Sequence, residues 1–397
     1  MRTTLSQEAN HFRRFLPASG IRRIFDRAKE IEASGCPVLH LEIGRPDYSQ
    51  PFGAVQSAQE AMDAGLVHYI ANRGLPELRE AMAEDIHASA GIDFDPGTEI
   101  IVTTGASEAL SMVALALLGP GDEVIIPEPA WSHYRAVVQM AGATTVALSL
   151  AGAGRGFVLD PEELAKVITD KTRMIVLNTP GNPSGAVQPP DVLREVARLA
   201  MKHGIFVFSD EVYKDFVYEG EHVSIGAFMA DSDRFIYVNS LSKSYAMTGW
   251  RIGYVAARAE VSDALNRIHQ YLTVCGVAFA QKGAVQALRG PRRQEYLAGM
   301  RKAFQDRRRI WQDAWADCSG FQCAAPGGAF YLFPRIDYRD MNAREFCNFM
   351  LDEHQVAMVP GDVFGDAYDH HVRISFGRDL STQEAAAERL IGVINAG

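Results

Sequence analysis

The chain is poor in cysteine and has no long apolar run. The first shortage argues against disulfide and metal sites, and the second argues against a membrane protein. Its 397 residues include five cysteines, an odd number, and no two of them form a C-x-x-C pair. A disulfide framework and a metal site are therefore not expected. The N-terminal stretch lacks the apolar core of about 7–15 residues that a signal peptide needs. No uncharged run approaches the roughly 20 residues of a membrane span, so we expect a cytoplasmic protein without a membrane partner.

Positive charge is also in short supply. Lys and Arg number 39 against 49 Asp and Glu, which gives a formal net charge of −10. A nucleic-acid or anionic-membrane partner would select a basic face, so neither partner is expected. Small anionic substrates are still allowed, because a few arginines can outweigh the mean field at contact distance.

The central region alternates between two periodicities. Short apolar runs typical of strands lie at 99–104, 122–127, 172–178, 204–210 and 234–240, and helical periodicity marks Glu108–Leu118, His133–Ala141 and Asp191–His203. This alternation predicts βαβ units on a mostly parallel sheet. The runs are apolar on both faces, as expected for strands that helices cover on both sides.

The two ends of the chain follow another pattern. We expect a helix over 21–33, a strand over 38–44, long helices after about residue 290, and strands over 328–334, 356–360 and 371–377. Helices followed by strands suggest a separate, smaller α+β domain. The expected division is an N-terminal arm and part of the small domain at 1–47, a large domain at 48–288 and a C-terminal small domain at 289–397.

A lysine between two serines lies where the chain leaves a buried strand. The segment NSLSKSYAMTGWRIGY, residues 239–254, contains Ser240, Ser242, Lys243 and Arg251. Lysine can form a Schiff base with an aldehyde, and arginine offers a rigid fork to phosphate oxygens. The hydroxyls and the arginine suit a phosphate beside the amine. A solvated loop lysine is the alternative for an isolated S-K-S.

Asp210 ends an apolar strand within FVFSDEVYKDF, residues 206–216. Ligands bind at the carboxyl ends of parallel strands, and a carboxylate there could keep a pyridine nitrogen protonated. Tyr213 could reach a neighbouring ring hydroxyl. The alternatives are a helix N-cap for Asp210 and an ordinary half-buried aromatic for Tyr213.

A glycine turn and an aromatic ring offer further contacts for a phosphorylated ring. In IVTTGASEALSMVALALL, residues 101–118, a strand leads through Gly105, Ala106 and Ser107 into a helix. Helix N-termini bind phosphate through free N–H groups. Trp131 follows another strand end, where a flat cofactor ring could stack on it. A core tryptophan is the alternative.

Three residues are candidates for binding the substrate. Asn182, in the turn LNTPGNPSG, lies at the same expected sheet edge as Asp210 and could donate to a ring oxygen, although a turn needs no further explanation. In HVRISFG, the alternation separates Arg373 from the apolar residues. Arg373 then faces either solvent or a substrate carboxylate. Gly44 ends another expected strand and would let a substrate approach the backbone.

Together these segments resemble the class I/II aminotransferases of PLP fold type I, which are similar to aspartate aminotransferase. The resemblance runs from about residue 16 to Phe376 and rests on Y-x-x-x-x-G, G-A-S-E-A-L, G-N-P-S-G, S-D-E-V-Y, S-L-S-K-S and T-G-W-R-I-G-Y, in this order. It implies an α/β fold with a mostly parallel mixed sheet sandwiched by helices, plus a smaller α+β domain. The implied cofactor is pyridoxal 5′-phosphate (PLP), and the implied reaction moves an amino group from an L-amino acid to a 2-oxo acid through aldimine, quinonoid and ketimine intermediates.

The resemblance also gives each candidate a role. Lys243 would bind the cofactor and shuttle the proton, Asp210 would pair with the ring nitrogen, and Tyr213 and Asn182 would contact the ring oxygen. The remaining cofactor contacts would be Trp131 on the ring and, around the phosphate, Gly105, Ala106, Ser107, Ser240, Ser242 and Arg251. Tyr69 of HYIANRG would reach the phosphate of a second subunit, which implies a homodimer with shared active sites. The substrate would lie against Gly44, Trp131, Asn182 and Arg373.

Two other kinds of function remain alternatives. Decarboxylases, β-eliminating lyases and cyclases share these cofactor motifs. A ligand-sensing module with this fold would carry an N-terminal DNA-binding domain, and the match begins near residue 16, which leaves no room for one. Transamination is therefore the leading hypothesis.

Overall fold

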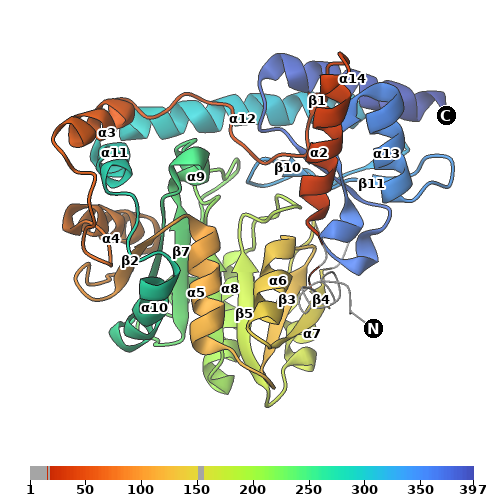
Figure 1. Ribbon diagram of the computed structural model, residues 1–397. Coiled ribbons are helices and arrows are strands. Elements are labelled where there is room, and N and C mark those ends of the chain that lie inside the picture. The colour runs from red at the N-terminus through yellow and green to blue at the C-terminus, as the bar shows by residue number, and fades with distance from the viewer. Residues whose placement is uncertain (1–15, 17, 151–155) are drawn as a thin grey trace, which may run out of the picture.

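A seven-stranded mixed sheet forms the centre of the computed structural model, which describes residues 16, 18–150 and 156–397 (Figure 1). The strand order is β2-β8-β7-β6-β5-β3-β4, and β8 alone runs antiparallel to both of its neighbours. The strands are β2 (Ile100–Thr103), β3 (Glu123–Glu128), β4 (Thr144–Ser149), β5 (Thr172–Asn178), β6 (Phe206–Asp210), β7 (Phe235–Ser240) and β8 (Gly253–Ala257). The predicted fold class is confirmed.

Helices cover both faces of this sheet (Figure 1). The helices of this part of the chain are α4 (Pro76–Ala90), α5 (Ala106–Leu117), α6 (Ser132–Met140), α7 (Pro161–Val167), α8 (Pro190–His203), α10 (Ala259–Leu272) and α11 (Ala278–Arg289). A further helix, α3 (Ala54–Asp63), packs against α11 and not on the sheet. Successive strand residues point to opposite faces, so Val207 joins one hydrophobic cluster and Phe208 another. This is why the central strands are apolar along their whole length.

The N-terminal and C-terminal segments build a second, smaller body above the sheet (Figure 1). Its helices are α2 (Gly20–Ala33), α12 (Arg293–Trp315), α13 (Ala343–His354) and α14 (Leu380–Ala396). Its short strands are β1 (Leu39–His40), β9 (Phe321–Gln322), β10 (Tyr331–Leu332), β11 (Arg335–Ile336), β12 (Val356–Ala357), β13 (Val359–Pro360) and β14 (Val372–Ser375). β1 pairs in parallel with β12, which ties the N-terminal segment to the C-terminal one. The domain boundaries stay a prediction, and the N-terminal arm lies partly outside the described residues.

Three expected strands of this body differ from the structure. The run 38–44 keeps only the two residues of β1. The run 356–360 is divided between two sheets, because β12 pairs with β1 whereas β13 pairs with β14. The run 328–334 keeps only β10, since Ala329 adopts a left-handed φ of 52° that interrupts the extended chain.

The sheet brings distant segments together at one edge. Asn178 and Asp210 are paired at the carboxyl ends of β5 and β6. Gly253 of β8 is paired with Ser240 on one side and Thr103 on the other, so the turns that follow β7 and β2 become neighbours. Among the described residues, no helix is both long and apolar enough to cross a membrane.

Candidate active site

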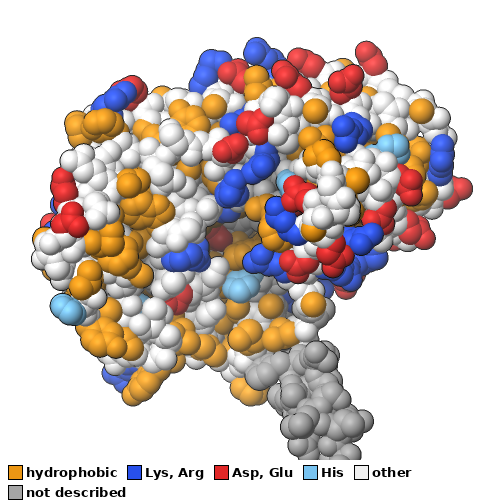
Figure 2. Space-filling model, turned by 45° about the horizontal axis from the view of Figure 1, so that its top comes forward, with side chains coloured by type: hydrophobic (Ala, Val, Ile, Leu, Met, Phe, Trp, Pro, Cys, Tyr) orange, Lys and Arg blue, Asp and Glu red, His pale blue; other side chains and the backbone are white. Residues whose placement is uncertain are grey.

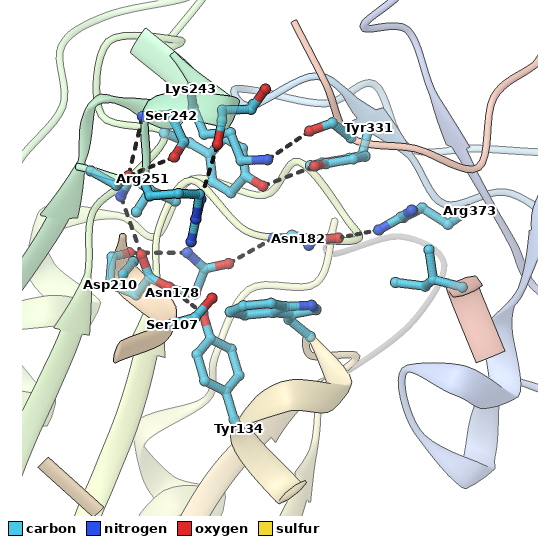
Figure 3. A pocket seen from close by; sticks show the side chains of 18 residues that line it. Ser107, Tyr134, Asn178, Asn182, Asp210, Ser242, Lys243, Arg251, Tyr331 and Arg373 are labelled. Carbon is cyan, nitrogen blue, oxygen red and sulfur yellow. Dashed lines mark hydrogen bonds between the residues drawn. The ribbon is translucent and has the colours of Figure 1, made fainter. Parts of the chain in front are cut away.

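A cavity of about 240 Å³ opens at this sheet edge, in the hollow between the sheet and the smaller body (Figures 2 and 3). Twelve of the fourteen predicted site residues line it: Gly44, Ala106, Ser107, Trp131, Asn182, Asp210, Tyr213, Ser240, Ser242, Lys243, Arg251 and Arg373. Six further residues complete the lining: Ile21, Tyr134, Asn178, Val212, Thr248 and Tyr331. Segments from both ends and the middle of the chain therefore meet around one space.

The two remaining predicted residues lie outside this lining. Gly105 adopts a φ of 74°, and a Cβ at this position would collide with the guanidinium of Arg251, so only glycine fits. Tyr69 is 85% exposed on the protein surface. It reaches solvent rather than the cavity of its own chain.

Lys243 lies on the single turn α9 (Leu241–Ser244), directly after β7. Ser240 caps this turn by accepting a hydrogen bond from Ser242 N at 3.1 Å. The Lys243 Nζ donates to Gly44 O at 2.6 Å. Burial, and next the charge of Arg373, lower the pKa of Lys243 to about 8. A substantial fraction of the amine is therefore neutral at pH values near 8.

Asp210 offers a buried carboxylate beside this amine. β6 runs through Asp210 into a turn at 212–215, so the N-cap alternative is wrong. Its Oδ2 accepts from Tyr134 OH at 2.6 Å and its Oδ1 from Val212 N at 3.3 Å. Burial raises the pKa of Asp210 to about 6, although the hydrogen bond from Tyr134 opposes this shift. A cation placed next to this carboxylate would relieve the cost of burying it.

Donor groups gather where α5 begins. The first residues of α5 are Ala106 and Ser107, whose backbone N–H groups have no partner within the helix. Arg251, at the end of the 3₁₀ turn Thr248–Trp250, donates to Thr104 O at 3.1 Å and to Thr248 O at 3.0 Å. A helix N-terminus and a guanidinium together form a site for an anion such as phosphate.

Arg373 lies on the opposite side of the cavity and is only 2% exposed. The alternative of an arginine facing solvent is wrong, because both faces of β14 are buried. Its Nη1 donates to Asn182 Oδ1 at 3.1 Å, its Nη2 donates to Glu42 O, and its guanidinium lies over the Tyr331 ring at 4.9 Å. Its Nε is buried without a hydrogen-bond partner among the described residues. The guanidinium of Arg373 lines the cavity, where it could bind a carboxylate.

The comparisons with known proteins agree with this geometry. The family described as aminotransferase class I and II matches residues 37–390. The chain belongs to the class I and II aminotransferases. Members of this aspartate aminotransferase-like family use PLP, and this chain is a PLP-dependent transaminase.

Two relatives and one solved structure show the extent of the similarity. The aminotransferase is 40% identical to an aspartate aminotransferase of Pyrococcus abyssi, over 95% of each chain. It is 38% identical to aromatic-amino-acid aminotransferase 2 of Thermococcus litoralis, again over 95% of each chain. The structure of Thermus thermophilus aspartate aminotransferase with maleate superposes with a TM-score of 0.91 at 34% identity, over 99% of this chain and 100% of that one.

The sequence of this aminotransferase gave little signal for several lining residues. The hydroxyls of Tyr331 and Tyr213 are hydrogen-bonded at 2.8 Å, and Tyr134 OH donates to Asp210. In the sequence, however, Tyr331 and Tyr134 lie in patterns typical of core aromatics. Asn178 could have been found, because it ends β5 directly beside Asp210. It donates to Asp210 O at 3.0 Å and accepts from Asn182 N at 2.8 Å, and so fixes the turn that carries Asn182 (Figure 3).

Proposed function

We propose that Lys243 Nζ captures the aldehyde of PLP and that the amino-acid substrate binds between this lysine and Arg373. The observation that carries the proposal is the position of three groups around one cavity: an amine with a pKa of about 8, a carboxylate with a pKa raised to about 6, and a buried arginine with an unpartnered Nε. The amine would react with the aldehyde, the carboxylate would pair with the pyridine nitrogen, and the arginine would bind the substrate carboxylate.

The rest of the lining supports the same placement of PLP. The phosphate would lie against the start of α5, Arg251 and the serine hydroxyls, with Gly105 keeping the turn open for Arg251. Trp131 would stack on the ring, while Asn182 and Tyr213 would contact its oxygen. The Tyr213 hydroxyl is held by Tyr331 OH at 2.8 Å, and burial raises the pKa of Tyr213 well above its usual value, so it binds as a neutral phenol.

The chemistry divides between the cofactor and the protein. When bound, PLP supplies an electron sink for the electron pair left behind by the α-proton. Lys243 Nζ, once neutral, accepts that proton, and Gly44 O holds the amine by the hydrogen bond described above. Asp210 keeps the ring nitrogen positively charged. Arg373 fixes the substrate carboxylate.

Replacing Arg373 with lysine should raise the KM for the amino acid by roughly 10- to 100-fold, with a smaller change in kcat. Lysine keeps the charge but loses the planar fork that satisfies Asn182, Glu42 and a carboxylate together. Steady-state kinetics with an amino acid and the matching amine without a carboxylate would measure this loss. The ratio of kcat/KM for the amino acid to kcat/KM for the amine should be smaller in the variant than in the wild type. An unchanged ratio would contradict the role given to Arg373.

The side chain of the donor would lie toward Ile21 and Trp131. The cations among the described lining residues are Lys243, Arg251 and Arg373, and all three already have partners in this scheme. Ser107 offers no positive charge to a second carboxylate. Relatives are named for aspartate and for aromatic amino acids. We infer that this chain prefers an aromatic or aliphatic donor over aspartate.

A panel of L-amino acids, added singly to the PLP enzyme without an acceptor, tests the reaction. A donor should bleach the cofactor absorbance and yield its 2-oxo acid in equal amount to the pyridoxamine form. Release of CO₂, or release of ammonia with continued turnover, would favour a decarboxylase or lyase instead. Failure of every donor to give a 2-oxo acid would contradict transamination by this protein.

An exposed apolar surface supports a homodimer. Phe52 and Val55 line one surface groove, and Val55 and Val277 line the next. Hydrophobic side chains gather over α3 and α11, on the left in Figure 2. Tyr271 is 91% exposed near the end of α10, and Tyr69 is exposed as well. Large exposed apolar surfaces mark interaction sites. We infer that a second copy of the chain covers this surface and receives Tyr69 at its phosphate site.

A cytoplasmic location stays a prediction from the sequence.

A further inference from the structure

A buried histidine outside the cavity joins two segments that the proposed function uses separately. His269 of α10 is 0% exposed. Its Nδ1 lies 2.8 Å from Glu108 Oε1, and its Nε2 lies 2.9 Å from Asn72 O. A backbone carbonyl only accepts, so Nε2 carries a proton. Burial raises the pKa of Glu108, but hydrogen bonds from His269 and Thr273 outweigh it and hold that pKa below its usual value. One buried ring therefore joins the Glu108 carboxylate to the Asn72 carbonyl.

On one side, the contact between His269 and Glu108 holds the turn that precedes α5. Glu108 Oε2 accepts the N–H of Thr104 at 2.5 Å. The carbonyl of the same residue accepts from Arg251 Nη2 at 3.1 Å. Both backbone groups of Thr104 are thus bound, the N–H by Glu108 and the carbonyl by the arginine that the proposed function gives to the phosphate. A movement of Glu108 would shift Thr104 and displace Arg251.

On the other side, His269 holds the segment that carries Tyr69, through its contact with Asn72 O. Asn72 follows Tyr69 by three residues and donates from its side chain to Val274 O. The next residues have anchors of their own, because Val102 N donates to Arg73 O at 3.1 Å and Leu75 N donates to Gln281 Oε1 at 2.8 Å. His269 therefore holds the part of the segment that lies nearest to Tyr69.

We infer that the hydrogen-bonded pair His269–Glu108 is a strut that fixes the phosphate-binding turn of one subunit relative to the Tyr69 segment that the same subunit gives to its partner. His269 is a positioning residue, since it acts on the phosphate only through Thr104, Arg251 and Tyr69. The inference rests on the proposed function, in which Tyr69 completes the partner's phosphate site. It assigns one buried histidine an influence on two active sites.

Replacing His269 with glutamine tests the strut in the PLP-loaded dimer. Glutamine can keep one of the two contacts of the imidazole ring but loses the other. Because a buried acceptor is left unsatisfied, the dissociation constant for PLP should rise roughly tenfold. Equilibrium dialysis measures retention without turnover. His87→Gln is the matched control, because His87 is exposed on α4 and pairs with exposed Asp93; retention in this control should match the wild type.

Mixed dimers separate a positioning role from a merely structural one. One chain carries Lys243→Ala, so that only its partner can hold PLP covalently. When the Lys243→Ala chain also carries His269→Gln, the partner's intact site should lose PLP several-fold faster, because it receives Tyr69 from the altered chain. When the chain with intact Lys243 carries His269→Gln instead, the same site should also lose PLP faster. The reason here is that Thr104 and Arg251 of that chain are displaced. The inference would be overturned if His269→Gln in the partner chain left the rate of PLP loss from the intact site unchanged. It would also be overturned if the protein were a monomer.

A double-mutant cycle gives an independent readout. His269→Gln and Glu108→Gln should weaken PLP retention non-additively, since both break the same connection. Additive losses would show that the two residues act apart and would contradict the strut. Failure here leaves the proposed function standing if wild-type protein binds PLP. Protein that never binds PLP would refute the proposed function itself.

Discussion

Replacing Lys243 with alanine should lower kcat by on the order of 10⁴-fold or more. The variant loses both the covalent attachment of the cofactor and the base that accepts the α-proton, and each role alone is worth several orders of magnitude. PLP should still bind through the phosphate and ring contacts, since these come from other segments. Single-turnover kinetics with an excess of amino acid would measure the loss.

Two controls make the Lys243 experiment specific. Lys202→Ala, on the exposed side of α8, should keep wild-type kcat. A small primary amine added to Lys243→Ala should restore part of the activity, because it can occupy the space left by the side chain and accept the proton. Full activity without added amine would contradict the assignment of the base.

Replacing Asp210 with asparagine should lower kcat by on the order of 10²–10³-fold, because a neutral amide does not hold positive charge on the ring nitrogen. The same change should stabilise the protein without PLP. The Asp210 carboxyl has a pKa of about 6 in the folded chain and roughly 3.9 when unfolded. Its contribution to stability is present below the unfolded pKa and is lost as the pH rises through the folded pKa.

This loss amounts to about 3 kcal/mol for a shift of some two units, and it is complete above roughly pH 7. The asparagine variant does not titrate and should not show the loss. Denaturant unfolding of the PLP-free proteins between about pH 4 and pH 8 would measure the difference. Asp231→Asn, at an exposed position, is the control and should follow the wild type. A less stable Asp210→Asn protein at pH 8, or one with normal kcat, would contradict the account.

Site residues were predictable from the sequence where a charged side chain stands close to an apolar run. Asp210 and Lys243 each follow closely on an apolar run, and a charged residue at that point stands out from the run before it. Tyr134 and Tyr331 do not stand out, since a tyrosine among apolar residues is typical of a core. Arg373 was ambiguous, because alternation separates two faces of a strand without revealing what covers each face. Only the structure showed that all four residues of β14, which point alternately to its two faces, are buried.

The fold was predictable for the same physical reason. The central strands are buried on both sides and leave continuous apolar runs in the sequence. β4 lies at the edge of the sheet and is largely half-buried or exposed, so TTVALS carries no comparable signal. The division of 356–360 between β12 and β13 depends on pairing partners distant in sequence. Long-range pairing of this kind is what a local pattern does not contain.

Chemical trapping of the cofactor tests the central claim most directly. Borohydride reduction of the PLP-loaded protein makes the covalent bond permanent, and peptide mass spectrometry then locates it. The account expects one phosphopyridoxyl group per chain, on the peptide that contains Lys243, with loss of the label when an amino-acid donor is added before reduction. A label on another lysine, or none on a protein that had turned yellow with PLP, would contradict it.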